Sequence, residues 1–504
     1  MSQIRRQSII SSVVVYTGFV LGFLNTYLFT REGGFTKAEY GLTGIFIAIA
    51  AMMYAIANMG LPSYIYKFYP YYKDNLPNKK NDMLSWSLLL SIAGFCLVVL
   101  GGLIFKDLII RKFGTNSPEL VKYFYWIFPF GLGLTIFSIL EAYAWQLHKS
   151  VLTNFLKEVQ FRVFTTLLII LSFAGIIHGF DLFIKLYSLT YLAIAILLFA
   201  YLAFSKQIHF QFSISKVTRK FSKQILRLLT FIYSGGLVFT LASVFDSILI
   251  ASVLPQGMAL AGIYTLAQNI GSLIQAPQRG IIASSIPSLA AAWKNKDMGR
   301  ISRIYTRSSV NQLIFSVGMF ALIWLNFSDG VFSFHLQSGY LDAKWVFFYI
   351  GMMRIIDMGT GLNAQIIATS TFWRFDFITG VVLLIITLPL NYILTKYYYG
   401  VMGPAISNLI SFSLYNAIRY FFLIKRFKMQ PFTIKTIYTI VLGVSAYYIA
   451  YLLFKNQIGI VWIVARSACF IVLYGIGTLL LKLSPDIQPV WYTILKRLGI
   501  KKGE

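Results

Sequence analysis

The sequence of residues 83–105 is MLSWSLLLSIAGFCLVVLGGLIF, which contains no charged side chain. A helix needs about 20 mostly apolar residues to cross a bilayer, because each residue advances about 1.5 Å through a hydrocarbon core of roughly 30 Å. The apolar residues of this run are continuous, whereas those of a barrel strand would alternate over ~10 residues. The run is therefore predicted to be a membrane-spanning helix.

The rest of the chain has the same character. Of its 504 residues, 58% are hydrophobic and 12% are charged, against about 45–50% and about 25% in soluble domains. This composition excludes a water-soluble enzyme and predicts an all-α polytopic membrane protein. Fourteen spans are predicted, at residues 9–30, 40–60, 83–105, 122–145, 160–178, 183–204, 228–252, 259–290, 308–327, 344–368, 375–395, 400–424, 436–454 and 459–481.

The basic residues test this count. The chain has 44 Lys and Arg against 17 Asp and Glu, a net charge of +27. With the N-terminus inside, thirty basic residues fall in inner loops, ten in outer loops and four within spans. Cytoplasmic loops carry such an excess of Lys and Arg. We therefore expect a bacterial inner-membrane protein with both termini in the cytoplasm, and no nucleic-acid partner.

The loops and motifs exclude several functions. The predicted outer loops are too short for a catalytic domain, and the sequence contains neither GxxxxGK[ST] for a nucleotide nor HExxH for zinc. The two cysteines and four histidines lack the spacing of metal ligands. We expect no enzymatic activity, no cofactor and no metal site.

A weak internal repeat predicts the domain organisation. Gly41 and Gly60 recur as Gly262 and Gly280 at an offset of about 220 residues. Six spans separate the copies, so both halves enter the membrane from the same side. We expect two parallel six-helix bundles around a central cavity, with two helices appended. The predicted divisions are an N-terminal bundle (1–204), a basic cytoplasmic linker (205–227), a C-terminal bundle (228–424), the last two spans (436–481) and a cytoplasmic tail (482–504).

Several motifs carry a family resemblance. They are RRQSIISSVVVYTGFVLGFLN at 5–25, YGLTGIF at 40–46, NMGLPSYIYKFYPYYKD at 58–74, FDSILIASVL at 245–254 and AGIYTLAQNIGSLIQAPQRGIIASSIPSLAAAWKNKD at 261–297. With them the chain resembles the polysaccharide transporters, or lipid-linked oligosaccharide (O-antigen) flippases, of the multidrug/oligosaccharidyl-lipid/polysaccharide exporter superfamily. Asp246, Tyr264 and Pro287 match that pattern. NMGLPSYIYK replaces the acidic-glycine signature of peptidoglycan-precursor flippases, which argues against that substrate.

Five ionisable residues lie deep in the predicted spans: Glu141, Asp246, Arg279, Arg354 and Asp357. A charge at mid-bilayer costs ~2.5–3.5 kcal/mol on insertion scales, so such residues are expected to face a partner or a wet cavity. Arg279 lies between Pro277 and Gly280, which would bend the helix. Its guanidinium is our main candidate for binding a phosphate, with an inter-helix salt bridge as the alternative.

The other deep residues leave alternatives open. Arg354 and Asp357 are three positions apart and share a helix face, so they form either a structural ion pair or part of the cavity. Asp246 either pairs with Arg279 or takes a proton or sodium ion. Glu141 lies near the cytoplasmic end of its span, where it is either hydrated at the interface or part of the substrate cavity.

Three basic residues near the ends of predicted spans have simpler explanations. Arg419 and Arg466 lie within one or two turns of helix ends and are expected to snorkel to the interface. Lys67 lies just past the second span, where it could meet an incoming pyrophosphate. Membership of a basic loop also accounts for it.

The family resemblance implies a transporter that moves a prenyl-pyrophosphate-linked oligosaccharide across the inner membrane by alternating access, and the placement of basic residues within the spans is compatible with such an anionic substrate. The expected partners are the lipid-linked oligosaccharide, the phospholipid bilayer and a glycan polymerase or glycosyltransferase, with H⁺ or Na⁺ as the coupling ion. A cation-coupled multidrug or small-molecule exporter of the same fold is the first alternative. A membrane glycan polymerase is the second, and the short outer loops argue against it.

Overall fold

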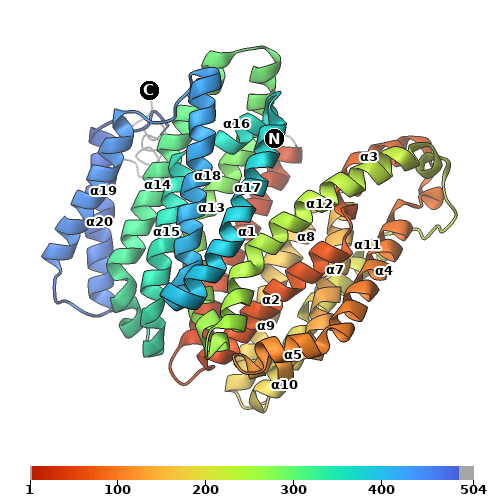
Figure 1. Ribbon diagram of the computed structural model, residues 1–504, viewed down its shortest axis with the longest axis horizontal. Helices are drawn as coiled ribbons and strands as arrows, with labels where there is room; N and C mark the ends of the chain where they lie inside the picture. Colours follow the sequence, from red (N-terminus) through yellow and green to blue (C-terminus); the bar gives the residue numbers. More distant parts are fainter. Residues whose placement is uncertain (1–2, 487–504) are drawn as a thin grey trace. The chain divides into compact units, whose positions relative to one another are not determined.

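The computed structural model describes residues 3–486 (Figure 1). Regular structure in that range is helical throughout, with no β-strand, which confirms the predicted all-α class. The chain forms two compact units, Met1–Gly262 (unit 1) and Ile263–Glu504 (unit 2). Most of the predicted tail lies outside the described residues, and the other predicted domain bounds stay predictions.

Unit 1 contains twelve α-helices, three short 3₁₀ or π segments and the first residues of α13. They are α1 (Gln3–Thr30), α2 (Lys37–Ala57), α3 (Leu61–Asn75), η1 (Asn78–Lys80), α4 (Met83–Ile104), α5 (Lys106–Phe113), α6 (Pro118–Lys122), η2 (Phe124–Trp126), α7 (Ile127–Gln146), α8 (Ser150–Asn154), η3 (Phe155–Gln160), α9 (Phe161–Phe173), α10 (Gly179–Ser188), α11 (Thr190–Phe204) and α12 (Lys216–Val253).

Unit 2 contains the rest of α13 and seven further α-helices. The elements are α13 (Gly257–Lys294), α14 (Met298–Ser333), η4 (Ser338–Asp342), α15 (Ala343–Gly359), α16 (Asn363–Thr369), α17 (Trp373–Ile393), η5 (Leu394–Tyr399), η6 (Gly400–Met402), α18 (Gly403–Phe427), α19 (Ile434–Leu453) and α20 (Ile460–Leu480). Within this unit α19 and α20 pack side by side against α14 (Figure 1).

Each of the fourteen predicted spans is helical over most of its length. Within the described residues, nine helical stretches are long and apolar enough to cross a membrane, and one of them, residues 374–427, includes two predicted spans. The protein is therefore a multi-pass membrane protein, while the count of fourteen stays a prediction. The predicted span 344–368 shows why the two counts differ. Its first helix, α15, has only 17 residues and carries the charged Arg354 and Asp357, so it is too short to be included among the nine.

Local sequence signals set where helices begin. Thr36 caps α2, because its hydroxyl accepts a hydrogen bond from the Glu39 amide at 3.2 Å and its own amide donates to Glu39 Oε2 at 2.7 Å. This reciprocal arrangement satisfies two amides that a helix start otherwise leaves without partners. Ser215 caps α12 through its hydroxyl, which accepts from the Thr218 amide at 3.1 Å.

Two glycines that the repeat pairs, Gly41 and Gly262, lie against each other. A Cβ atom on Gly41 would lie 2.8 Å from the amide nitrogen of Gly262 and would collide with the carbonyl oxygen of Met258. A Cβ on Gly262 would collide with the carbonyl oxygen of Lys37. Only glycine allows two helix backbones to approach this closely, so the packing of α2 on the start of α13 requires both residues.

The fifth predicted span begins earlier than the sequence indicated. Residues 150–173 form one continuous helical stretch, because the π-helical segment η3 joins α8 to α9. Arg162 is the third residue of the predicted span 160–178, although the charge count included it among the thirty inner-loop residues; it lies twelve residues into the observed helical stretch. At about 1.5 Å per residue this is about 18 Å from its start. The assignment of Arg162 to a loop is therefore wrong.

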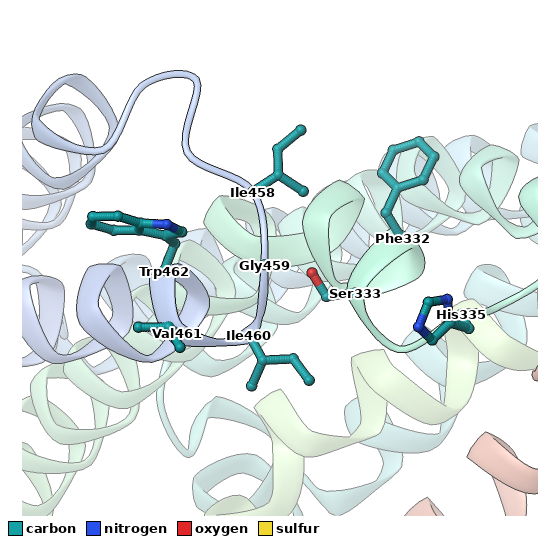
Figure 2. Close-up of a pocket in the computed structure, with 8 residues that line it drawn as sticks. All are labelled: Phe332, Ser333, His335, Ile458, Gly459, Ile460, Val461 and Trp462. Carbon is teal, nitrogen blue, oxygen red and sulfur yellow. The ribbon is translucent and has the colours of Figure 1, made fainter.

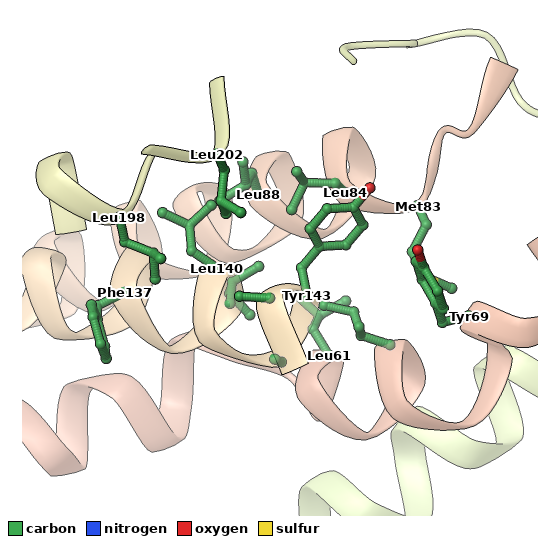
Figure 3. Packing of buried hydrophobic residues seen from close by; sticks show 14 of the residues in the cluster. Leu61, Tyr69, Met83, Leu84, Leu88, Phe137, Leu140, Tyr143, Leu198 and Leu202 are labelled. Atoms are coloured by element: carbon green, nitrogen blue, oxygen red, sulfur yellow. The ribbon is translucent and has the colours of Figure 1, made fainter. Parts of the chain in front are cut away.

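A hydrophobic core of the first unit lies where α3, α4, α7 and α11 meet (Figure 3). Leu61, Leu84, Leu140 and Leu198 come from these four helices and are fully or almost fully buried. Val217 adds the first turn of α12 to the same core. Helices that are distant in sequence are thereby fixed at one end of unit 1.

Candidate functional site

The six predicted site residues divide equally between the units. Unit 1 holds Lys67, Glu141 and Asp246, and unit 2 holds Arg279, Arg354 and Asp357. The predicted pairing of Asp246 with Arg279 thus joins residues of different units and stays a prediction.

In unit 1, Glu141 on α7 is buried and ion-paired. The residue is 7% exposed, and its Oε2 accepts a hydrogen bond from Lys157 Nζ at 3.2 Å. Lys157 belongs to the π-helical segment η3. A buried charge needs a partner of opposite charge, and Lys157 provides it. Pairing with Lys157, rather than hydration at the interface, therefore compensates the charge of Glu141.

A second charged pair lies next to it. Arg162 Nη1 donates to both the carbonyl oxygen and Oε2 of Glu158 at 2.5 Å. The Arg162 side chain packs against Gly22 of α1, where an added Cβ would lie 2.9 Å from Arg162 Nε. A Cβ added to Gly18 would lie 2.9 Å from Glu158 Cβ. The Gly-x-x-x-Gly spacing of α1 was the available signal for a close helix contact. No prediction from the sequence made use of this spacing.

The remaining predicted residues of unit 1 differ in exposure. Asp246 on α12 is buried, with 5% of its surface exposed. Lys67 on α3 is exposed, with its ammonium 5.9 Å from the centroid of the Phe68 ring. The described contacts bring neither residue to the Glu141 cluster.

In unit 2, Asp357 is the centre of a network of neutral donors. Its Oδ2 accepts from Gln278 Nε2 at 3.1 Å and its Oδ1 from Asn416 Nδ2 at 3.2 Å. Asn416 Oδ1 in turn accepts from Thr360 Oγ1 at 2.9 Å and from Asn363 Nδ2 at 2.7 Å. Side chains of α13 and α18 therefore contact one half-buried carboxylate of α15 directly, and Asn363 of α16 joins the network through Asn416.

Arg279 and Arg354 lie on the same two helices as this network. Arg279 is exposed and directly follows Gln278, the residue through which α13 contacts Asp357. Arg354 is half-buried and lies one turn before Asp357 on α15. The structure thus brings the positions of these three predicted residues together within unit 2, while the Arg354–Asp357 ion pair stays a prediction.

Two arginines expected to reach the interface are buried instead. Arg419 is 2% exposed and Arg466 is 5% exposed. Arg419 Nη2 donates to Asp376, and Arg466 Nη2 donates to Asp329. The prediction of snorkelling is wrong for both, because each guanidinium has a carboxylate partner on a neighbouring helix.

The cluster around Arg466 ties the last helix to α14. Asn326 Oδ1 accepts from Arg466 Nε at 3.0 Å, and Asn326 Nδ2 donates to Ser467 Oγ at 3.0 Å. Asp329 was not predicted to be a deep ionisable residue, because it lies two residues beyond the predicted end of its span. The helix itself continues to Ser333.

The charged groups of unit 2 differ in whether their donors already have acidic partners. Within the described residues no cluster of three or more His, Cys, Asp or Glu could hold a metal ion. Arg419 and Arg466 already form ion pairs with carboxylates. Arg279 is exposed, and a planar guanidinium fork can bind phosphate bidentately.

A shallow pocket at the far end of α14 lies apart from these groups. It has a volume of about 480 Å³ and is lined by Phe332, Ser333 and His335 together with residues 458–462 (Figure 2). None of the predicted site residues lines it.

Comparison with known proteins identifies the family. Residues 4–293, more than half of the chain, match the model of the family described as "Polysaccharide biosynthesis protein". No curated protein matches the sequence.

Solved structures show the same fold. The chain is similar to the lipid II flippase MurJ in an inward closed conformation, with a TM-score of 0.69 and 16% identity, covering 93% of this chain and 98% of that structure. It is also similar to an inward-facing multidrug resistance MATE transporter, with a TM-score of 0.59, 16% identity and coverage of 83% and 97%. The chain therefore belongs to the polysaccharide biosynthesis protein family and has the fold of the flippase MurJ and the MATE transporters.

Proposed function

We propose that the protein moves an oligosaccharide carried on a prenyl pyrophosphate across the membrane, for the synthesis of a cell-surface polysaccharide. Membership of the polysaccharide biosynthesis family and a fold shared with a lipid II flippase support this proposal. The observation that carries it is the exposed Arg279, one residue from the side chain that contacts Asp357.

In this proposal Arg279 binds the pyrophosphate. A pyrophosphate is a dense anion, and a guanidinium fork forms two parallel charge-assisted hydrogen bonds with it. Arg354 supplies a second cation from α15. The hydrophilic glycan crosses through hydrated space, and the prenyl tail stays in the bilayer during alternating access.

Asp357 is the proposed coupling group, with H⁺ or Na⁺ as the ion. The carboxylate accepts hydrogen bonds from the side-chain amides of Gln278 and Asn416. Both amides are neutral, so these two contacts do not neutralise the negative charge. A bound cation would neutralise it, because a charge within a membrane protein favours a partner.

The setting follows from the same assignment. We propose an inner-membrane location with both termini in the cytoplasm, a purely transporting role without catalysis, and cooperation with a glycosyltransferase or polymerase. O-antigen, capsule and exopolysaccharide are the candidate products.

A cation-coupled exporter of small molecules is the second candidate. The likeness to MATE transporters in inward-facing and outward-facing conformations, with TM-scores of 0.59 and 0.56, favours it. In that case Asp246 and Glu141, both buried in unit 1, would be the operative residues.

Depletion of the protein in its host separates the two candidates. Membrane lipids are analysed by mass spectrometry, and the sugars of intact spheroplasts are probed from outside. The flippase proposal predicts that a completed prenyl-pyrophosphate glycan accumulates and stays inaccessible. An unchanged lipid pool with new sensitivity to small cationic compounds would overturn the flippase proposal and support export.

A further inference from the structure

The segment between α11 and α12 exposes large apolar side chains in a regular order. Phe210, Phe212 and Ile214 are 50%, 58% and 55% exposed. The backbone between them is fixed from the other side, because the Gln211 amide donates to Ser85 Oγ at 2.8 Å. The segment is therefore held against unit 1 with its apolar side chains outward.

These side chains lie at the level where two apolar helices end. The segment follows α11 directly, and α11 ends at Phe204. Ser85 is the third residue of α4, and α4 forms part of a candidate span. A chain held at the first turn of one apolar helix and just past the last turn of another lies near the bilayer surface, where large aromatic residues are enriched.

Cations flank the apolar side chains. Residues 205–227 contain six basic residues and no acidic residue. All six are exposed: Lys206, Lys216, Arg219, Lys220, Lys223 and Arg227. Basic residues next to aromatic and aliphatic ones are typical of segments that lie on anionic membrane surfaces.

A buried hydrogen-bond chain fixes the start of α12. Asp82 is fully buried, and its Oδ2 accepts from the Ser215 amide and from Thr218 Oγ1, both at 2.8 Å. The hydroxyl groups of Thr218 and Tyr72 are 2.6 Å apart. Burial raises the pKa of the Tyr72 phenol, so Tyr72 keeps its proton. Asp82 also lies at the N-terminal end of α12, which stabilises a negative charge.

We propose that residues 206–220 anchor unit 1 to anionic phospholipids of the adjacent leaflet. Phe210, Phe212 and Ile214 insert at the boundary of headgroups and acyl chains, and the flanking cations bind lipid phosphates. The predicted linker is then a membrane anchor instead of a free connection. This inference does not depend on the identity of the transported substrate.

Fluorescence at one position tests the insertion. Cys96 and Cys469 are replaced by serine in the full chain, and Phe212→Cys is labelled with an environment-sensitive fluorophore. Asn78→Cys, in the exposed turn η1, serves as the matched control. In nanodiscs containing phosphatidylglycerol, spin-labelled lipids should quench the label at 212 and iodide should not. The label at 78 should show the reverse.

Charge removal tests the lipid preference. The combined change Lys216→Gln, Arg219→Gln and Lys220→Gln should lower the preference for phosphatidylglycerol over phosphatidylcholine, by up to about fivefold for each cation. Lys455→Gln, in the exposed turn between α19 and α20, should leave that preference unchanged. Size-exclusion chromatography establishes that every variant is folded before it is scored.

Three results would overturn the proposal. The first is equal quenching by iodide at 212 and 78 in phosphatidylglycerol nanodiscs. The second is protection at 212 that is the same with and without phosphatidylglycerol. The third is efficient disulfide cross-linking of unlabelled Phe212→Cys between two molecules, which would identify a second copy of the chain as the partner.

Discussion

Unit 2 contains arginines in two contrasting settings. Arg419 on α18 is buried, with Nη2 donating to Asp376, Nε donating to Thr379 Oγ1 at 3.2 Å, and its guanidinium carbon 3.8 Å from the centroid of the Tyr415 ring. Arg279 on α13 is exposed beside the Asp357 network. The sequence separates them only by depth in their predicted spans, and it does not reveal that Arg419 is buried against a carboxylate on a neighbouring helix.

The difference teaches what each guanidinium can do. A side chain whose donors already serve a carboxylate and a hydroxyl, and whose face is covered by a ring, stabilises the packing of its helix. A side chain with exposed donors can bind an anion that arrives and leaves. Arg419 and Arg466 are therefore structural residues, and Arg279 is the residue that we propose as the ligand-binding group.

The largest expected effect comes from breaking a buried pair. Arg419→Ala leaves Asp376 without its partner and should destabilise unit 2 by about 3–5 kcal/mol. Thermal unfolding of the purified protein measures it. The double variant Arg419→Met, Asp376→Leu should recover most of the loss, because apolar replacement of both partners is often neutral. If Arg419→Ala unfolded like the wild type but no longer transported, Arg419 would belong with Arg279.

Arg279→Ala should have the next largest effect, and on transport alone. Loss of charge-assisted hydrogen bonds worth about 1.5–3 kcal/mol predicts roughly ten- to hundredfold weaker substrate binding. The unfolding temperature should stay at the wild-type value, since Arg279 is exposed. Arg279→Lys, which keeps the charge without the fork, should give an intermediate rate in the same transport assay. Normal transport by Arg279→Ala would remove it from the mechanism.

Asp357→Asn tests the carboxylate that lies beside Arg279 and Arg354, and it should change ion coupling more than stability. The amide has nearly the same volume and can still accept from Gln278, so stability should fall by about 1 kcal/mol. Transport should slow several-fold and lose its dependence on the H⁺ or Na⁺ gradient. Rates measured with and without each gradient give the answer. An unchanged gradient dependence would exclude Asp357 as the coupling group.

Lys67→Gln is expected to have the smallest effect. Lys67 is exposed on α3, and its nearest described partner is the Phe68 ring at 5.9 Å. Surface substitutions of this kind change stability by about ±0.5 kcal/mol. Complementation of a depleted strain should be nearly complete. A loss as large as that of Arg279→Ala would instead place Lys67 on the substrate pathway.

Composition and hydropathy predicted the helices well where charges are absent, as in residues 83–105. They failed at residues 150–160, because Lys157 and Glu158 look like loop residues when their partners are unknown. Asp329 and Asp376 were overlooked for the same reason. Each lies within two residues of a predicted span end, and only the fold brings Arg466 and Arg419 to them.

The candidate site shows the same limit. Sequence reasoning selected Arg279, Arg354 and Asp357 from their depth in apolar segments. It could not select Gln278 or Asn416, because neutral amides are common in helices and their importance arises from contacts 79 and 59 residues away along the chain. The glycine pair at positions 41 and 262 was detectable because it recurs at the repeat offset.

The most direct test is transport by the purified protein in proteoliposomes. A prenyl-pyrophosphate oligosaccharide is loaded into both leaflets, and a glycosidase added outside removes the sugars that it can reach. The account predicts that wild-type protein makes the inner pool reachable, whereas Arg279→Ala protein does so far more slowly at the same substrate level, in line with its roughly ten- to hundredfold weaker substrate binding. If wild-type protein left the inner pool protected while it moved small cations across the same membrane, the flippase account would be contradicted.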